Sequence, residues 1–150
     1  ALCPQGMSLD ALHQAIYGER KVSQGTLKTE MSQLRDTLTG LLGSRPYRLL
    51  MPIDGDFLRV EQSLNAGYLE AAIKLYTGIF FSKTESPFLC TWRTCLEARL
   101  SQAIYHSDQV DLLLMHLSNC PDASDAIERL IELMPDNLSI HQHLEVLSNR

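Results

Sequence analysis

Residues 6–50 carry the patterns of a helix, a polar linker, a second helix and a short strand, and this order constrains the fold more than any other feature of the sequence. The first helix is expected to begin after Ser8, which has good capping chemistry, and to end at Gly18. The second is expected to begin after Ser23 and to reach Leu38. The order predicts a mainly α fold with a small β wing.

The second helix has one apolar stripe and one polar side. Apolar side chains recur at intervals of four, three and four, at Leu27, Met31, Leu34 and Leu38. The rest of its surface carries small, polar or cationic groups that can hydrogen-bond to base edges or phosphates. We expect this helix to present Gln24, Thr26, Thr29 and Ser32 to bases, and Lys28 and Arg35 to phosphates or guanines. The strand expected over residues 45–50 adds two further cations for the same role, Arg45 and Arg48.

Charge is distributed unevenly along the chain of 150 residues, whose net charge is −5. Residues 1–50 hold six Lys/Arg against four Asp/Glu, a balance of +2, whereas residues 51–150 hold seven against fourteen, a balance of −7. Only the first third is therefore expected to attract a polyanion.

The segment from Met51 to Asp56, with a proline and an Asp-Gly pair, reads as a connector. We expect a winged helix-turn-helix domain over residues 1–55 and a helical module over residues 56–150. Helices in the module are predicted at residues 57–64, 68–76, 88–105, 108–117 and 124–134 and after Ser139, which forms a capping box with Gln142. Asp108 is expected to cap its helix, and Trp92 to seal the hairpin of the first two helices.

Two segments carry a resemblance to a known family, namely Thr26-Leu-Lys-Thr-Glu-Met-Ser-Gln-Leu34-Arg35 and Arg45-Pro-Tyr47-Arg48-Leu49. These segments resemble the recognition helix and the final wing strand of response-regulator winged-helix domains. The resemblance implies DNA binding by the residues named above. Two departures are present: the glycine-rich wing is reduced to Gly43-Ser44, and the family's N-terminal sheet would precede Ala1.

The second half is similar to another family, through Leu64-Asn-Ala-Gly67-Tyr-Leu-Glu-Ala71-Ala-Ile-Lys-Leu75-Tyr76-Thr-Gly78, Ser86-Pro87 and Trp92-Arg93…Leu96-Glu97. It resembles the bacterial transcriptional activator domain, a tetratricopeptide-like helical module. The whole resembles the C-terminal region of GAF-sensor bacterial regulators. That resemblance implies a cytoplasmic, sequence-specific transcription regulator that is the output region of a larger sensor protein. Its implied partners are double-stranded DNA, an N-terminal sensor domain of the same protein and a second copy in a homodimer.

Several other functions find no support in the sequence. The chain lacks a phosphate-binding glycine loop and a nucleophile elbow, so we expect no catalytic residue, no cofactor and no enzyme. His141 and His143 point to opposite sides of a helix, and Cys90 and Cys95 do not share a face, so no metal site is expected. The four cysteines are expected to be free, buried thiols, and His13, His106 and His116 to be surface or interface residues. No apolar run is long enough for a membrane span.

Two alternatives to DNA binding remain open. Residues 8–38 can be two core-packed helices without a ligand. The helical part can instead be a protein-interaction module that docks a sensor domain or a partner protein without binding DNA.

Overall fold

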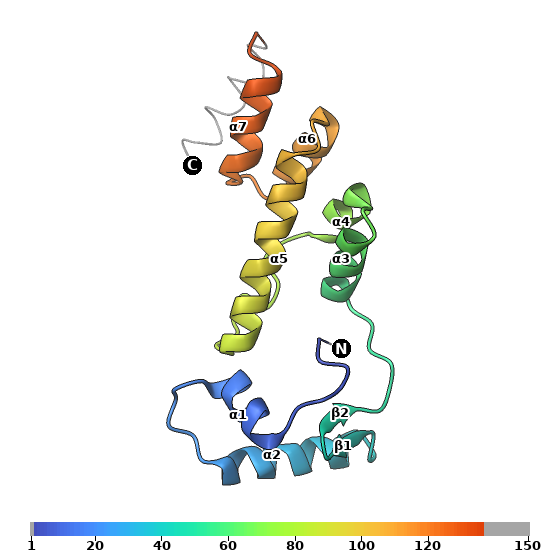
Figure 1. The fold of residues 1–150 in the computed structure, drawn as a ribbon, viewed down its shortest axis with the longest axis vertical. Helices are drawn as coiled ribbons and strands as arrows, with labels where there is room; N and C mark the ends of the chain where they lie inside the picture. Colours follow the sequence, from blue (N-terminus) through green and yellow to red (C-terminus); the bar gives the residue numbers. More distant parts are fainter. Residues whose placement is uncertain (1, 137–150) are drawn as a thin grey trace. The chain divides into compact units, whose positions relative to one another are not determined.

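The computed structural model describes residues 2–136, and these residues form a mainly helical fold with one small antiparallel sheet (Figure 1). The predicted mainly α class is confirmed. The elements in chain order are α1 (Leu9–Tyr17), α2 (Gln24–Thr37), β1 (Leu42–Ser44), β2 (Tyr47–Leu49), α3 (Asp56–Asn65), α4 (Leu69–Leu75), α5 (Pro87–Tyr105), α6 (Val110–Asn119) and α7 (Ser124–Leu133). The helix expected after Ser139, with His141 and His143, lies outside the described residues.

Internal contacts divide the chain into two compact units. Unit 1 comprises Ala1–Leu58 and Phe81–Arg93, and unit 2 comprises Arg59–Phe80 and Thr94–Arg150. We expected one boundary, after residue 55. The chain instead passes from unit 1 to unit 2 after Leu58, and Phe81–Arg93 belongs to unit 1 again. α3 and α5 therefore each contribute residues to both units.

Two serines begin the helices of unit 1 as predicted. The Ser8 hydroxyl accepts from the Ala11 amide at 3.1 Å, and the Ser23 hydroxyl accepts from the Thr26 amide at 3.1 Å. These bonds satisfy amides that a helix N-terminus leaves without an intrahelical acceptor. Leu27 then anchors α2, since its side chain is fully buried. The other side chains of the predicted apolar stripe are less buried than Leu27, and Leu34 is 39% exposed.

A short hairpin follows α2. Its strands pair antiparallel, with Leu42 opposite Leu49 and Ser44 opposite Tyr47. The strand expected over residues 45–50 is thus confirmed in part as β2, while its partner β1 was not predicted. Met7 adds a third, isolated pairing: its amide donates to the Tyr47 carbonyl at 3.0 Å, and the Tyr47 amide donates to the Met7 carbonyl at 2.8 Å. The hairpin is therefore tied to the residue just before α1.

Three aromatic rings form a cluster within unit 1. The Trp92 ring centroid lies 5.7 Å from that of Phe57 and 6.0 Å from that of Phe81, and the Phe57 and Phe81 centroids are 5.0 Å apart. The edge-to-face arrangement is favourable for aromatic quadrupoles. The expectation that Trp92 seals the α3–α4 hairpin is therefore wrong. Trp92 is half-buried, and its ring fastens the first turns of α5 to the start of α3.

Unit 2 has a core of leucine and isoleucine side chains drawn from four helices. The fully or almost fully buried members are Ile73, Leu96, Leu100, Ile104, Leu113 and Leu130. α4 packs against α6, and α6 packs against α7.

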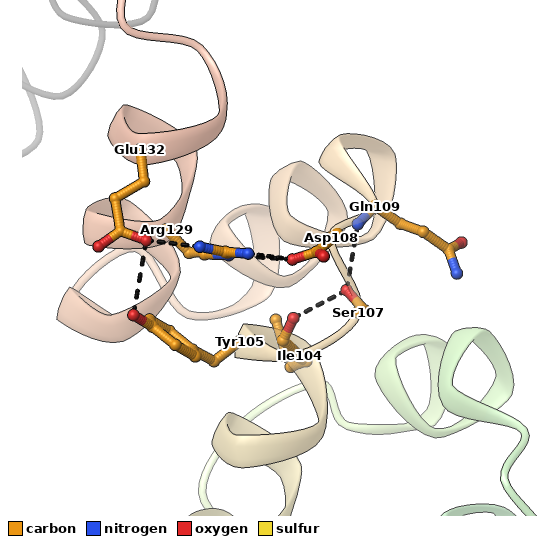
Figure 2. A network of polar contacts seen from close by, with 7 residues as sticks. All are labelled: Ile104, Tyr105, Ser107, Asp108, Gln109, Arg129 and Glu132. Carbon is orange, nitrogen blue, oxygen red and sulfur yellow. Dashed lines mark hydrogen bonds and ion pairs between the residues drawn. The ribbon is translucent and has the colours of Figure 1, made fainter.

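A polar network closes the turn between α5 and α6 (Figure 2). The Arg129 guanidinium donates to Asp108 and, at 2.6 Å, to Glu132, and it lies 5.3 Å from the centroid of the Tyr105 ring. Asp108 therefore does not cap α6 as expected. Gln109 takes the capping position without a side-chain hydrogen bond, and the Asp108 carboxylate pairs with α7 instead.

Candidate functional site

The predicted DNA-contact residues are mostly at the surface of unit 1. Arg35 is half-buried, whereas exposed side chains occur at Gln24, Thr26, Lys28, Thr29, Ser32, Arg45 and Arg48. Six of the eight residues lie on α2, and the other two, Arg45 and Arg48, lie on the hairpin. The burial of Leu27 turns the opposite side of α2, with Thr29 and Ser32, toward solvent.

Arg35 joins α2 to the hairpin. Its Nε donates to the carbonyl of Leu42, the first residue of β1, at 3.1 Å. The guanidinium thereby satisfies a strand carbonyl and fixes β1 beside the last turns of α2, where Figure 1 also draws the hairpin. Arg35 is therefore a positioning residue as well as a cation, which its sequence pattern did not indicate.

Three of the polar residues expected to approach bases already have intramolecular partners. Gln24 donates through Nε2 to Asp10, Thr26 shares a hydrogen bond with the Ser23 hydroxyl at 3.0 Å, and Thr29 donates to the Gly25 carbonyl at 3.1 Å. Such local bonds are common for threonine on a helix and leave the hydroxyl oxygen able to accept. The amide of Gln24, by contrast, must exchange Asp10 for any new acceptor.

Four residues of the set make no side-chain hydrogen bond or ion pair within the described part of the chain, namely Lys28, Ser32, Arg45 and Arg48. Lys28 and Ser32 are one turn apart on α2. Arg45 lies in the turn of the hairpin, and Arg48 pairs with Gly43 across it. Along the helix axis, Lys28 and the Arg35–hairpin junction are separated by roughly 10 Å at the α-helical rise. The structure thus sets one free cation on α2 and two on the hairpin that Arg35 holds against it.

An acidic residue of α2 is turned away from this polar side. The Tyr17 hydroxyl of α1 donates to a Glu30 carboxylate oxygen at 2.5 Å. This hydrogen bond, with smaller contributions from burial and from the Glu30 charge, raises the pKa of Tyr17. Glu30 is thus used in packing α1 against α2. Asp36 remains exposed near the C-terminal end of α2.

Two expectations about other reactive side chains are wrong. His116 is not a surface residue: it is 5% exposed, on a stripe of α6 with Leu112, Leu113 and Leu117. That placement was available from the sequence, because His116 lies three and four residues after two leucines. The four cysteines are free, as expected, but none is buried, and Cys95 is exposed.

Within residues 2–136, no group of three or more His, Cys, Asp or Glu side chains is arranged to hold a metal ion. In the same part of the chain, no helix combines the length and the apolar composition that a membrane crossing requires. Burial, reinforced by the charge of Glu97, raises the pKa of the Cys120 thiol, which lowers its thiolate fraction.

No protein-family model matches the chain, and no solved structure matches it. The chain is similar to a Rhodococcus erythropolis protein described as "Uncharacterized 47.3 kDa protein in thcA 5'region", with 29% identity over 125 residues. The match takes in 83% of this chain and 28% of the relative. The chain thus spans little more than a quarter of that relative's length.

Proposed function

We propose that the chain binds double-stranded DNA as a winged helix-turn-helix and serves in a bacterial transcription regulator. In this proposal α2 is the recognition helix and the β1–β2 hairpin is a short wing. No catalytic step is part of the proposal. Unit 2 is proposed to be a tetratricopeptide-like scaffold that contacts protein and not DNA.

The observation that carries the proposal is the arrangement around α2. A helix with a solvent-facing side of small polar residues lies beside a hairpin, and three cations on the two elements, Lys28, Arg45 and Arg48, have no partner among the described residues. Side chains of this kind contact phosphates in protein–DNA complexes and position the helix that reads the bases. The exposed Gly25 and Thr29 have little bulk, which would let α2 approach a groove closely.

The placement of acidic residues also supports the proposal. On α2, Glu30 is bound to Tyr17 of α1 and so lies away from the polar side, whereas Asp10 of α1 holds the Gln24 amide and has to release it before Gln24 can contact a base. Asp36 is the exception on the polar side of α2, and it lies near the helix end. Unit 1 holds eight Lys/Arg against seven Asp/Glu, a balance of +1, whereas unit 2 holds five against eleven, a balance of −6, which makes unit 1 the more favourable surface for phosphates.

A titration of labelled duplex DNA from the chain's own upstream region, read by fluorescence anisotropy, tests the proposal. Lys28→Gln should weaken binding several-fold, since it removes one phosphate contact and keeps the helix propensity of the position. Lys74→Gln is the matched control, because Lys74 lies in unit 2 and pairs with Glu70 at 2.5 Å. Equal affinities for parent and Lys28→Gln, with both proteins folded, would contradict the assignment of α2.

A second candidate function rests on exposed apolar side chains beside the hairpin. Exposed fractions of 39–50% are found at Leu41, Leu49, Leu50 and Met51. The Leu50 amide donates to the Leu41 carbonyl at 2.8 Å, so this apolar group is continuous across the hairpin. An exposed apolar group of this kind is typical of protein contacts, such as docking of a sensor domain. Leu50→Ser should leave DNA affinity unchanged under the first proposal and should abolish docking under the second.

A further inference from the structure

Unit 1 contains a cavity of about 410 Å³ that is lined almost entirely by apolar side chains. They come from the segment before α1, from α1, α2 and the hairpin, from the connector and the start of α3, and from Phe81 and the first turn of α5. The volume falls in the range of small-ligand sites, roughly 300–1,000 Å³, and such sites combine apolar walls with a few polar groups. The cavity therefore has the size and the lining of a ligand site.

The two helices of unit 1 leave their apolar stripes incompletely covered at this cavity. No side chain of α1 is fully buried, although Leu12 and Ile16 lie on its apolar side and line the cavity. On α2 only Leu27 is buried, while the two lining residues differ: Met31 is half-buried and Leu34 is 39% exposed. A helix in a folded domain normally buries such a stripe against another element. An apolar molecule that fills the cavity would complete the burial of both stripes.

Arg48 is the only charged residue in the lining, and no carboxylate of the described residues lines the cavity with it. Its side chain makes no hydrogen bond or ion pair within the described part of the chain. Its stem packs on two glycines: a Cβ added at Gly6 would lie 2.9 Å from the Arg48 Cβ, and one added at Gly43 would lie 3.6 Å from the Arg48 Cγ. These glycines leave room for the stem and hold the cation at the hairpin side of the cavity. The cavity is therefore suited to an anionic group and unsuited to a cation.

We propose that this cavity binds a medium-chain fatty acid, with the acyl chain among the apolar walls and the carboxylate at Arg48. A guanidinium can donate two parallel hydrogen bonds to one carboxylate, which suits this pairing. The acyl chain is flexible and can follow walls built from adaptable side chains such as Met31 and Leu34. The uncovered apolar stripes account for the chain, and the unpaired cation in an otherwise uncharged lining accounts for the carboxylate.

The single tryptophan of the chain provides an intrinsic probe of the cavity. The Trp92 ring centroid lies 5.7 Å from that of Phe57 and 6.0 Å from that of Phe81, and both phenylalanines line the cavity. The full chain is titrated with sodium decanoate below its micelle concentration, and a saturable change in Trp92 emission is expected. In a ¹⁵N-labelled sample the amide shifts should fall in residues 12–16, 31–34 and 47–49. Octanoate is two methylenes shorter and should bind about tenfold more weakly.

A neutral analogue and two charge variants test the role of Arg48. 1-Decanol keeps the ten-carbon chain and lacks the charge, and it should bind roughly threefold to tenfold more weakly than decanoate, as for a charge-assisted hydrogen bond at an exposed side chain. Arg48→Gln should lower decanoate affinity by the same factor and leave decanol affinity unchanged, which also shows that the cavity is intact. Arg45→Gln removes the same charge from the hairpin turn, outside the cavity lining, and should change neither affinity. Because Arg48 is also a proposed phosphate contact, these titrations contain no DNA.

Two exposed leucines test the apolar wall. Leu34 is 39% exposed and lines the cavity, whereas Leu41 is 41% exposed and lies outside the lining. Leu34→Gln should weaken decanoate and decanol alike by several-fold, since it removes apolar surface from the site. Leu41→Gln is the matched control and should leave both affinities at the parent's values.

Three results would overturn the proposal. One is the absence of a saturable change in Trp92 emission and of amide shifts at the cavity with decanoate. Another is equal binding of decanoate and decanol, which would leave an apolar cavity with no preference for an anion. The third is an Arg48→Gln protein that binds decanoate as well as Arg45→Gln does, since the carboxylate would then not be held by Arg48.

Discussion

Replacing Trp92 with alanine should lower the free energy of unfolding by about 2–3 kcal/mol. Removal of a fully buried tryptophan costs about 3–5 kcal/mol. Trp92 is half-buried, so the substitution loses only part of that transfer free energy. The two edge-to-face pairs with Phe57 and Phe81 are also removed, each contributing about 0.5–1.5 kcal/mol. Because the figure for full burial already includes such ring contacts, they are not added to it, and partial burial lowers the expected loss to about 2–3 kcal/mol.

Urea denaturation followed by far-UV circular dichroism measures this loss, and Trp92→Phe is the matched variant, because it keeps an aromatic ring in the cluster. Amide hydrogen exchange then locates the effect. The amides of residues 87–93 and of the segment before Leu58 should lose protection more than those around Leu113, because the cluster lies within unit 1. A Trp92→Ala protein within about 0.5 kcal/mol of the parent, the usual range for a surface substitution, would refute this account of the cluster.

Other predictions concern single positions. Leu113→Ala, at a fully buried site, should cost about 2–5 kcal/mol, whereas Leu114→Ala, at a side chain 43% exposed, should cost far less when both are compared by thermal unfolding. The pKa of His116 is lowered by burial below its value of 6.5 in an unfolded chain, so stability should be full above that pH and fall as the pH drops below it. His116→Gln should flatten that fall in urea titrations at several pH values, and an unchanged pH profile would count against a buried neutral ring. Gly6→Ala should destabilise the hairpin by about 1–3 kcal/mol, because Gly6 has φ +78° and a Cβ would meet the Tyr47 carbonyl oxygen at 2.8 Å. Gly40→Ala, at φ +85° in open space, incurs the backbone strain alone and should cost less.

The helices could be predicted from local signals. Ser8 and Ser23 mark the beginnings of α1 and α2 by their chemistry, and the leucine spacing of α2 correctly placed Leu27 in the core. Such signals act within a few residues along the chain. The exposed position of Lys28 also follows from periodicity, because polar side chains on the far side of a buried helical stripe face solvent.

Non-local contacts could not be predicted in this way. The pairing of Met7 with Tyr47, the Arg35–Leu42 hydrogen bond and the aromatic partners of Trp92 all depend on which segments meet in space. Asp108 shows the same limit, since its local sequence favours a cap while a distant guanidinium, that of Arg129, offers a charged partner.

The salt dependence of DNA affinity tests the central claim most directly. Parent and a Lys28→Gln, Arg45→Gln, Arg48→Gln triple variant are titrated with the same duplex at several salt concentrations, and the slope of log affinity against log salt is compared. Each lost phosphate contact should reduce the slope by about 0.9, so three lost contacts should reduce it by about 2–3. A folded triple variant with the parent's slope and affinity would contradict DNA binding through α2 and the hairpin.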